Sequence, residues 1–230
     1  MRTTQTCSIT QLKTQAISHA PSSLTVSNLS CIRNDRQLFG AVDVSLESGQ
    51  YLHITGPNGV GKTSLLRTIC GLMSAEPAES GDIKWNGVPI QQVRDEFHQN
   101  LCYLGHQNAL QEAATVQDNL RFLGSLKGLA FDDADIQLAL TQFGLSGSAK
   151  RLVRHLSQGQ KRRVVLSQLV LSQAALWVLD EAFVSLDEAG QGILTALITT
   201  HLRRGGMAVL TSHQAIVLDD VVPQILDLSA

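Results

Sequence analysis

The sequence predicts an α/β fold with a mainly parallel sheet at its core, a small antiparallel β region and a helical lobe. Three observations support this prediction. Short apolar runs alternate with helix-length segments, polar side chains stand where these runs end, and one run leads into a glycine-rich loop that opens a helix. Strands that are buried on both faces of a parallel sheet form short, nearly continuous apolar runs of this kind.

The predicted parallel strands occupy residues 51–55, 101–104, 176–179 and 208–211. The polar residues that follow them are, in the same order, Gly56, His106 and Gln107, Asp180 and Glu181, and Ser212 and His213. Ligands bind at the carboxyl ends of the strands in such sheets. We therefore expect these residues to meet at one site.

Two further segments predict the antiparallel region. Residues 24–29 alternate as a strand does, and residues 83–90 contain the pair Asn86 and Gly87, which tight hairpin turns prefer. Residues 108–150 are mostly of helical type with glycine breaks, so we expect a helical lobe over roughly 108–160.

The composition narrows the classes of function. A chain of 230 residues with 43% hydrophobic content can bury the core of one domain. Its 18 basic and 20 acidic residues produce no long-range field that would attract nucleic acid. No run reaches the roughly 18–20 apolar residues that cross a bilayer. Residues 1–22 are rich in Ser, Thr and Gln without an apolar segment, so we interpret them as a polar extension.

The four cysteines are scattered and form no C-x-x-C pair. We expect reduced thiols rather than disulfides, a zinc site or covalent haem attachment. They are Cys7, Cys31, Cys70 and Cys102.

Residues 56–63 fit the phosphate-binding pattern G-x-x-x-x-G-K-[ST] between a predicted strand and a helix. The glycines let backbone N–H groups curl around phosphate oxygens, and the helix N-terminus adds a positive partial charge. Lys62 is suited to neutralise the β- and γ-phosphates, and the Thr63 hydroxyl is suited to bind Mg²⁺. The expected nucleotide-binding residues of this loop are Gly56, Pro57, Asn58, Gly59, Val60, Gly61, Lys62, Thr63 and Ser64.

Two adjacent carboxylates end the apolar run at residues 176–179. Asp180, at the strand end, is placed to hold Mg²⁺ through water, and Glu181 is placed to act as general base on the attacking water. Alone, such a pair is more often a solvated acidic turn, but the phosphate-binding loop in the same chain reverses this expectation.

A second anion site is predicted at residues 156–160, which read Leu-Ser-Gln-Gly-Gln and precede a basic, then apolar, helix. Ser157 and Gln160 have the spacing of a capping box, so Ser157 is the expected N-cap. Gly159 permits close approach of a phosphate to this helix N-terminus.

In this order the motifs resemble those of the ATP-binding-cassette (ABC) ATPases, from about Leu24 to His213. Residues 56–63 are similar to Walker A, Gln107 to the Q-loop, residues 156–160 to the signature, residues 176–181 to Walker B, residues 185–187 to the D-loop and His213 to the switch histidine. The resemblance implies ATP and Mg²⁺ as cofactors and a head-to-tail dimer of two copies. Each signature, with Ser157, Gly159 and Gln160, would close over the partner's ATP. It makes Glu181, His213 and Gln107 the candidate catalytic residues, and Thr63, Asp180 and Gln107 the candidate metal ligands.

Three positions depart from the family pattern. Gln158 replaces the first signature glycine, and Ala182 stands where proline usually follows the catalytic glutamate, which we expect to loosen that turn. Arg33 replaces an aromatic residue that stacks on adenine. Because a guanidinium can also stack on a π-face, Arg33 remains a candidate ATP contact with weaker base discrimination.

Details around these motifs resemble the haem-exporter ATPases of bacterial cytochrome c maturation. They are residues 103–107, Arg33 with residues 36–39, Trp177 and residues 211–214. The resemblance implies a peripheral subunit at the cytoplasmic face of the inner membrane. It would work with separate integral membrane subunits and drive haem delivery or release of a haem chaperone. In such transporters the Q-loop borders the groove where membrane subunits dock, so His106 is a candidate contact. We expect neither direct haem binding nor nucleic-acid binding.

Three alternatives stay open at this point. The chain could energise transport of another small substrate, act as a soluble mechanical ATPase on DNA or ribosomes, or bind nucleotide as a regulator without turnover. The single cassette without sustained heptads and the near-neutral charge disfavour the second. The presence of Glu181 and His213 disfavours the third.

Overall fold

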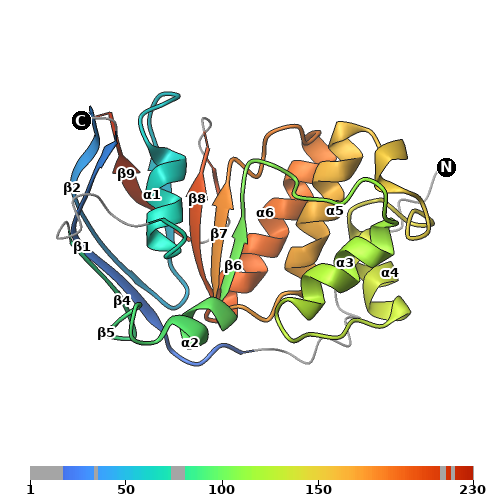
Figure 1. Cartoon of the computed structure of the whole chain (residues 1–230), viewed down its shortest axis with the longest axis horizontal. Helices are drawn as coiled ribbons and strands as arrows, with labels where there is room; N and C mark the ends of the chain where they lie inside the picture. Colours follow the sequence, from blue (N-terminus) through green and yellow to red (C-terminus); the bar gives the residue numbers. More distant parts are fainter. Residues whose placement is uncertain (1–17, 34–35, 74–80, 213–215, 219–220, 230) are drawn as a thin grey trace.

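A computed structural model describes residues 18–33, 36–73, 81–212, 216–218 and 221–229. The described chain is layered (Figure 1). An antiparallel sheet lies on one side, helix α1 (Lys62–Ile69) fills the space between it and a central parallel sheet, and further helices cover the other face of that sheet. The predicted fold class, an α/β cassette with a small antiparallel region and a helical lobe, is confirmed.

The central sheet has five parallel strands in the order β6-β7-β8-β3-β9. Four of them are the predicted strands, which confirms the interpretation of apolar runs as buried parallel strands. β9 was not predicted; it pairs with β3 at the edge, and its side chains are alternately half-buried and exposed. The bounds are β3 Tyr51–Thr55, β6 Leu101–Leu104, β7 Leu176–Asp180, β8 Met207–Thr211 and β9 Gln224–Asp227.

The antiparallel sheet has the order β2-β1-β4-β5. The predicted hairpin turn is confirmed, because Asn86 and Gly87 join β4 to β5 with positive φ angles of 51° and 80°. The predicted strand at residues 24–29 belongs to a longer strand, and its partner β2 was not predicted. The bounds are β1 Ser23–Arg33, β2 Arg36–Glu47, β4 Asp82–Trp85 and β5 Val88–Pro89.

Five α-helices besides α1 lie in the described residues, and α3, α4 and the start of α5 fall in the segment that was predicted as a helical lobe. In Figure 1, α3 and α4 lie farthest from the antiparallel sheet. The bounds are α2 Arg94–Gln99, α3 Val116–Ser125, α4 Asp133–Gln142, α5 Gln158–Leu171 and α6 Glu188–Arg203, with a 3₁₀ turn at Val153–His155.

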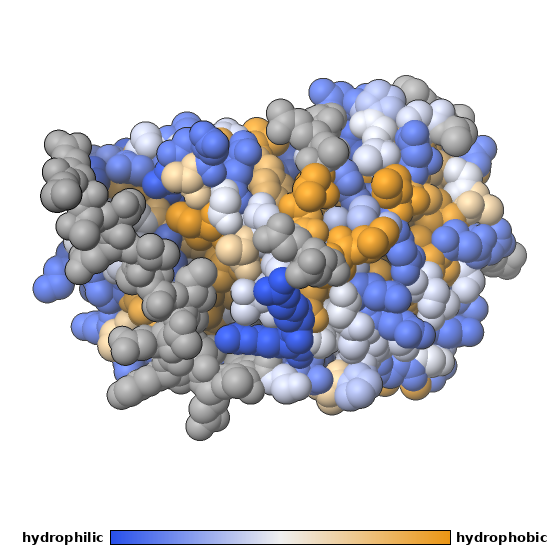
Figure 2. Space-filling model, turned by 180° about the vertical axis from the view of Figure 1, so that it is seen from behind, coloured by the Kyte–Doolittle hydropathy of each residue, from blue (hydrophilic) through white to orange (hydrophobic). Residues whose placement is uncertain are grey.

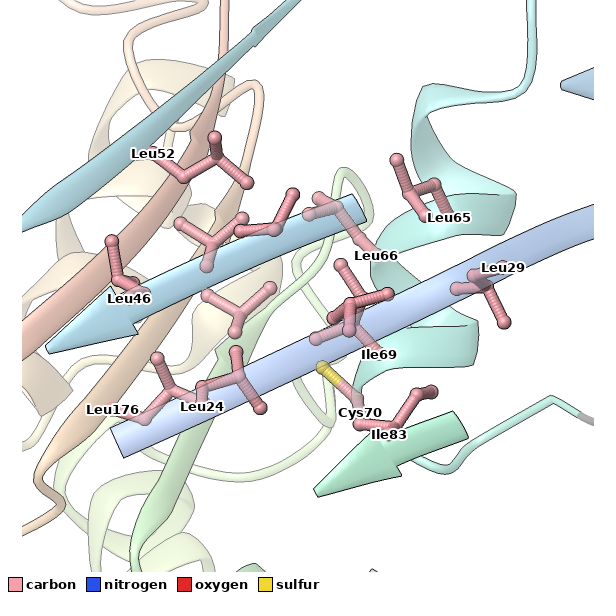
Figure 3. Close-up of a cluster of buried hydrophobic side chains, with 14 of the residues drawn as sticks. Leu24, Leu29, Leu46, Leu52, Leu65, Leu66, Ile69, Cys70, Ile83 and Leu176 are labelled. Carbon is pink, nitrogen blue, oxygen red and sulfur yellow. The ribbon is translucent and has the colours of Figure 1, made fainter. Parts of the chain in front are cut away.

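The largest apolar cluster lies around α1, between the two sheets (Figure 3). Leu65, Leu66 and Ile69 of α1 are fully buried against Leu24 of β1 and Leu176 of β7. Burying each such side chain contributes about 1.5–3 kcal/mol. This packing fixes the position of α1, and therefore of the loop that precedes it, relative to the parallel sheet.

A second cluster joins the other face of the parallel sheet to α5 and α6, and a third lies among α3, α4 and the start of α5. Helix α5 contributes to both, through Val165 and Leu166 to the second and through Val164 to the third. Helix α5 therefore connects the helical lobe to the sheet.

Of the polar extension predicted over residues 1–22, the structure describes residues 18–22. There the His19 N–H donates to the Arg204 carbonyl oxygen at 3.0 Å.

The surface seen from behind carries apolar side chains gathered near its middle, between hydrophilic flanks (Figure 2). In the described ranges, no helix combines the length and apolar content that crossing a membrane requires.

Candidate functional site

The strand order brings the polar strand ends together. β8 lies between β7 and β3, so the ends of these three strands are neighbours at one edge of the sheet. Thr211, the last residue of β8, is in register with Asp180 of β7 on one side and with Ile54 of β3 on the other. The loop after β3 leads directly into α1. The predicted convergence at the carboxyl edge is therefore observed for β3 and β7.

The loop at residues 56–63 curls around the ammonium group of Lys62. Lys62 Nζ donates to the carbonyl oxygens of Gly56 at 2.7 Å and Pro57 at 3.0 Å. Gly59 and Gly61 have φ angles of 80° and 110°, in the region that glycine adopts without a steric penalty. The loop thus has the backbone conformation that a phosphate-binding loop needs.

The N-terminus of α1 differs from those of the longer helices in the described part of the chain. Side chains cap α3, α4, α5 and α6, whereas no side chain caps α1. The leading N–H groups of α1 therefore lack a side-chain acceptor, and the helix end carries a positive partial charge. A surface cavity of about 280 Å³ opens here; its lining includes Leu38, residues of the loop, Ser64 and Glu181.

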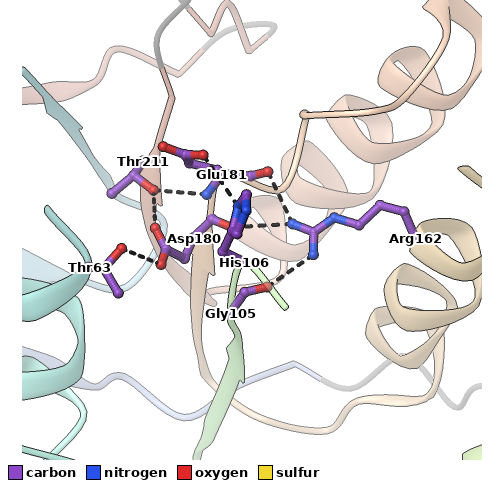
Figure 4. A network of polar contacts seen from close by, with 7 residues as sticks. All are labelled: Thr63, Gly105, His106, Arg162, Asp180, Glu181 and Thr211. Atoms are coloured by element: carbon purple, nitrogen blue, oxygen red, sulfur yellow. Dashed lines mark hydrogen bonds and ion pairs between the residues drawn. The ribbon is translucent and has the colours of Figure 1, made fainter. Parts of the chain in front are cut away.

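Asp180 is buried at the sheet edge and accepts hydrogen bonds on both carboxylate oxygens (Figure 4). Thr63 Oγ1 donates to Oδ2 at 2.7 Å, and Thr211 Oγ1 donates to Oδ1 at 2.8 Å. These bonds offset part of the cost of burying a carboxylate. They also place a hydroxyl and a carboxylate, which are hard oxygen ligands, directly beside the phosphate-binding loop.

Glu181 turns out of the sheet immediately after Asp180 with a left-handed φ of 49°. Its side chain is 21% exposed, and its Oε2 lies 3.4 Å from Nδ1 of His106. Glu181 also lines the cavity at the phosphate-binding loop. A carboxylate in this position can reach a water molecule inside the cavity.

Arg162, on α5, holds the main chain of this turn. Its guanidinium donates to the carbonyl oxygens of Gly105 at 3.0 Å, Asp180 at 3.2 Å and Glu181 at 3.1 Å (Figure 4). Burial lowers the pKa of Arg162, and the carboxylates of Asp180 and Glu181 offset part of that shift. A guanidinium stays protonated in proteins in any case. Sequence reasoning missed Arg162, because a charged residue in a basic run is usually exposed.

These contacts bear on the residue after Glu181. Ala182 was expected to loosen the turn in place of the family's proline. Its side chain is buried in the second core cluster, and Arg162 binds both carbonyl groups that precede it. The turn is therefore held by packing and hydrogen bonds without proline.

The predicted second anion site has the expected local structure. Ser157 caps α5, and the capping box with Gln160 is complete, which confirms the predicted N-cap. All three signature candidates, Ser157, Gly159 and Gln160, are described, and none of them lines the cavity at the phosphate-binding loop. Within one chain the two predicted anion sites are therefore separate.

Three other site predictions are not placed at this cavity. Gln107 and His106 line a second surface cavity of about 360 Å³, together with Gln158 and Lys161 of α5. His213 lies outside the described residues. Arg33 ends β1, and its side chain is likewise outside the described part. The roles of Gln107, His213 and Arg33 stay predictions.

Cys31, Cys70 and Cys102 are unpaired and buried, and Cys7 lies outside the described residues. Burial raises the pKa of the Cys70 and Cys102 thiols, so both stay protonated at neutral pH. Among the described residues, no cluster of three or more His, Cys, Asp or Glu side chains could hold a metal ion.

A phosphate-binding loop, an uncapped helix N-terminus and a carboxylate pair at the edge of a parallel sheet define a P-loop nucleotide-binding domain. Comparison with known proteins narrows the class. The family model described as "ABC transporter" matches residues 39–184. A putative ABC transporter ATP-binding protein from Pyrococcus furiosus superposes with a TM-score of 0.77 at 28% identity, covering 90% of this chain and 98% of that one.

Among curated proteins, the chain is 56% identical to the cytochrome c biogenesis ATP-binding export protein CcmA of Albidiferax ferrireducens, over 90% of this chain and 97% of the relative. It is 43% identical to the protein of the same name in Vibrio parahaemolyticus, over 85% and 94%. The chain therefore belongs to the ABC transporter ATP-binding family, within the group that contains these CcmA proteins. This confirms the family predicted from the motifs, and ATP is the nucleotide that this family binds.

Replacing Arg162 by Met should lower the free energy of unfolding by about 2–3 kcal/mol, because it removes the charged donor of three hydrogen bonds to main-chain carbonyl groups. Denaturant titration of the full chain measures this. Arg121→Met is the matched control: it removes only exposed ion pairs with Asp118 and Asp133, which are worth about 0–1 kcal/mol. Equal losses in the two variants would show that Arg162 does not hold the turn.

Proposed function

We propose that this chain is the ATP-hydrolysing subunit of a membrane transporter complex, the haem exporter or cytochrome c biogenesis system. The observation that carries the proposal is the carboxylate pair Asp180 and Glu181 at the phosphate-binding loop, with Thr63 Oγ1 2.7 Å from Asp180 Oδ2. The 56% identity to a CcmA protein supports the choice of system. Transport of another small substrate is the alternative.

The phosphate-binding loop positions the triphosphate of ATP. Lys62 Nζ, which donates to two loop carbonyl oxygens in this structure, would neutralise the β- and γ-phosphates when ATP binds. The N–H groups at the start of α1 donate to phosphate oxygens and stabilise the charge that develops during phosphoryl transfer. Leu38 provides an apolar side chain to the cavity wall.

The oxygen atoms of Thr63 and Asp180 fit Mg²⁺, which prefers hydroxyl, carboxylate and water ligands. These two residues would hold the ion, with Gln107 as the further ligand that the family resemblance implies. When bound, Mg²⁺ neutralises negative charge on the β- and γ-phosphates.

Glu181 is the general base of the reaction. Its carboxylate accepts a proton from the water that attacks the γ-phosphorus, and the γ-phosphoryl group leaves ADP to become inorganic phosphate. Its place on the cavity lining supports this role. The family resemblance gives His213 the role of a second contact to the γ-phosphate or the water.

The working unit is a head-to-tail dimer. Ser157, Gly159 and Gln160 lie at an N-terminus suited to phosphate, yet they do not line the cavity of their own chain. A second copy would bring its α5 N-terminus over the open side of that cavity. Each chain then supplies one part of each of two ATP sites.

Integral membrane subunits complete the complex at the cytoplasmic face of the inner membrane. The cavity beside Gln107 lies between the loop after β6 and α5, and it is lined by both polar and apolar residues. His106 belongs to this cavity and also contacts Glu181, so a subunit that docks there would lie one side chain from the general base.

Glu181→Gln should lower kcat for ATP hydrolysis by about 100-fold or more, since general-base catalysis contributes about that much. The dissociation constant for ATP should change little, and the ATP-bound dimer should live longer. Turnover and fluorescent-nucleotide binding measure these effects. Glu96→Gln makes the same change on an exposed residue of α2, which precedes β6 at the opposite edge of the sheet, and should be silent. Undiminished hydrolysis by Glu181→Gln would refute the base assignment.

The chain, isolated with a tag from detergent-solubilised membranes of its own host, should carry integral membrane proteins with it. Mass spectrometry of the purified complex identifies them. Glu181→Gln should recover the same partners, because it changes hydrolysis and leaves the cavity beside Gln107 intact. Recovery only from the soluble fraction, bound to ribosomes or DNA, would overturn the transporter proposal.

A further inference from the structure

Thr211, the last residue of β8, lies two positions before the candidate switch histidine, His213. The structure places it at the centre of the carboxyl edge, because β8 lies between the strand that ends in Asp180 and the strand that leads into the phosphate-binding loop. The residue is 1% exposed. A hydroxyl at a fully buried strand end has to find partners within the protein.

The Thr211 hydroxyl has two partners, and both belong to the carboxylate pair. Its hydrogen goes to Asp180 Oδ1 at 2.8 Å, and its oxygen accepts the N–H of Glu181 at 2.9 Å (Figure 4). A hydroxyl has one donor and two acceptor positions, so both bonds can form together. The Thr211 hydroxyl therefore connects the side chain of Asp180 to the main chain of Glu181 through two hydrogen bonds.

The second bond matters because Glu181 is in a conformation that side chains disfavour. A non-glycine residue with a left-handed φ, here 49°, costs of order 1–3 kcal/mol and persists only where surrounding contacts hold it. Thr211 holds the N–H of Glu181, and Arg162 holds its C=O at 3.1 Å. Both polar main-chain groups of the proposed general base are thus bound by side chains from two other elements.

We propose that Thr211 is a positioning residue for hydrolysis, which acts through its hydroxyl to orient the Asp180 carboxylate and to hold Glu181 in its left-handed conformation. The inference rests on the proposed function and adds to it a residue that touches neither nucleotide nor water. A purely structural role, in which Thr211 only packs at the end of β8, would depend on its shape. The positioning role depends on the hydroxyl.

Two substitutions separate shape from hydroxyl. Thr211→Val keeps the branched shape that suits a buried strand but has neither donor nor acceptor. Thr211→Ser keeps the hydroxyl and loses the methyl group. We expect Thr211→Val to fold because Val is a strong strand former, and Thr211→Ser to fold because it keeps both hydrogen bonds. Since Thr211 does not touch the nucleotide, both variants should bind ATP with a dissociation constant within about threefold of the wild type.

The first measurement is ATP turnover by the full chain, alone and in the complex isolated from membranes. Thr211→Val should lower kcat by about 10- to 100-fold, the effect of losing hydrogen bonds to charged or reacting groups. Thr211→Ser should stay within about threefold of the wild type, because it retains both bonds. Equal turnover by Thr211→Val and the wild type would overturn the proposal, and so would an equal fall in Thr211→Ser and Thr211→Val. A parallel loss of ATP binding and hydrolysis in Thr211→Val would overturn it as well.

The second measurement needs no turnover. Hydrogen exchange of the Glu181 amide, followed by NMR, should be about tenfold or more faster in Thr211→Val than in wild type and unchanged in Thr211→Ser, because the hydrogen bond protects that N–H. Unchanged exchange in Thr211→Val would overturn the proposal even if the chain proved not to hydrolyse ATP. Failure of the proposed function would appear separately, as equal turnover by wild type and Glu181→Gln.

Discussion

The site depends on a buried carboxylate. Asp180 lies at the end of a strand with apolar side chains on both faces, and its charge is tolerated there because hydroxyl groups from α1 and β8 each donate to one of its oxygens. These same bonds fix the distance between the phosphate-binding loop and the central strands. The packing of α1 between the two sheets, through side chains such as Leu65 and Ile69, also holds the phosphate-binding loop in place relative to the central strands.

The N-termini of two helices, α1 and α5, provide the two predicted anion sites of the chain. The N-terminus of α1 has no side-chain cap among the described residues and opens on the cavity beside Lys62, so it suits a phosphate of its own chain's ATP. The N-terminus of α5 is capped by Ser157 and contributes no residue to the lining of that cavity, so we propose that it binds the ATP of a second copy. Arg162 lies one turn further along α5 and binds the carbonyl groups beside Asp180 and Glu181. A shift of α5 would therefore change the position of Glu181, the proposed general base.

Local patterns predicted what depends on local chemistry. The buried strands, the turn at Asn86 and Gly87, the capping box of Ser157 and the phosphate-binding loop all follow from residues close together in sequence. Strand β2 pairs over most of its length with β1, and β9 pairs with a distant strand; their patterns alone did not reveal them. The roles of Thr211 and Arg162 depend on strand order and on the approach of α5 to the sheet. Neither is visible until the chain is folded.

We propose that one chain holds two incomplete ATP sites, which two copies complete. Mixing two inactive variants tests it most directly: Lys62→Ala, which cannot hold the phosphates, and Ser157→Arg, which blocks the signature. A mixed dimer contains one site in which both halves are intact. Turnover in an equal mixture should therefore recover to about a quarter of the wild-type rate, given random pairing of the two chains in a symmetric dimer. A mixture that stays at the average of the two separate variants would contradict the claim.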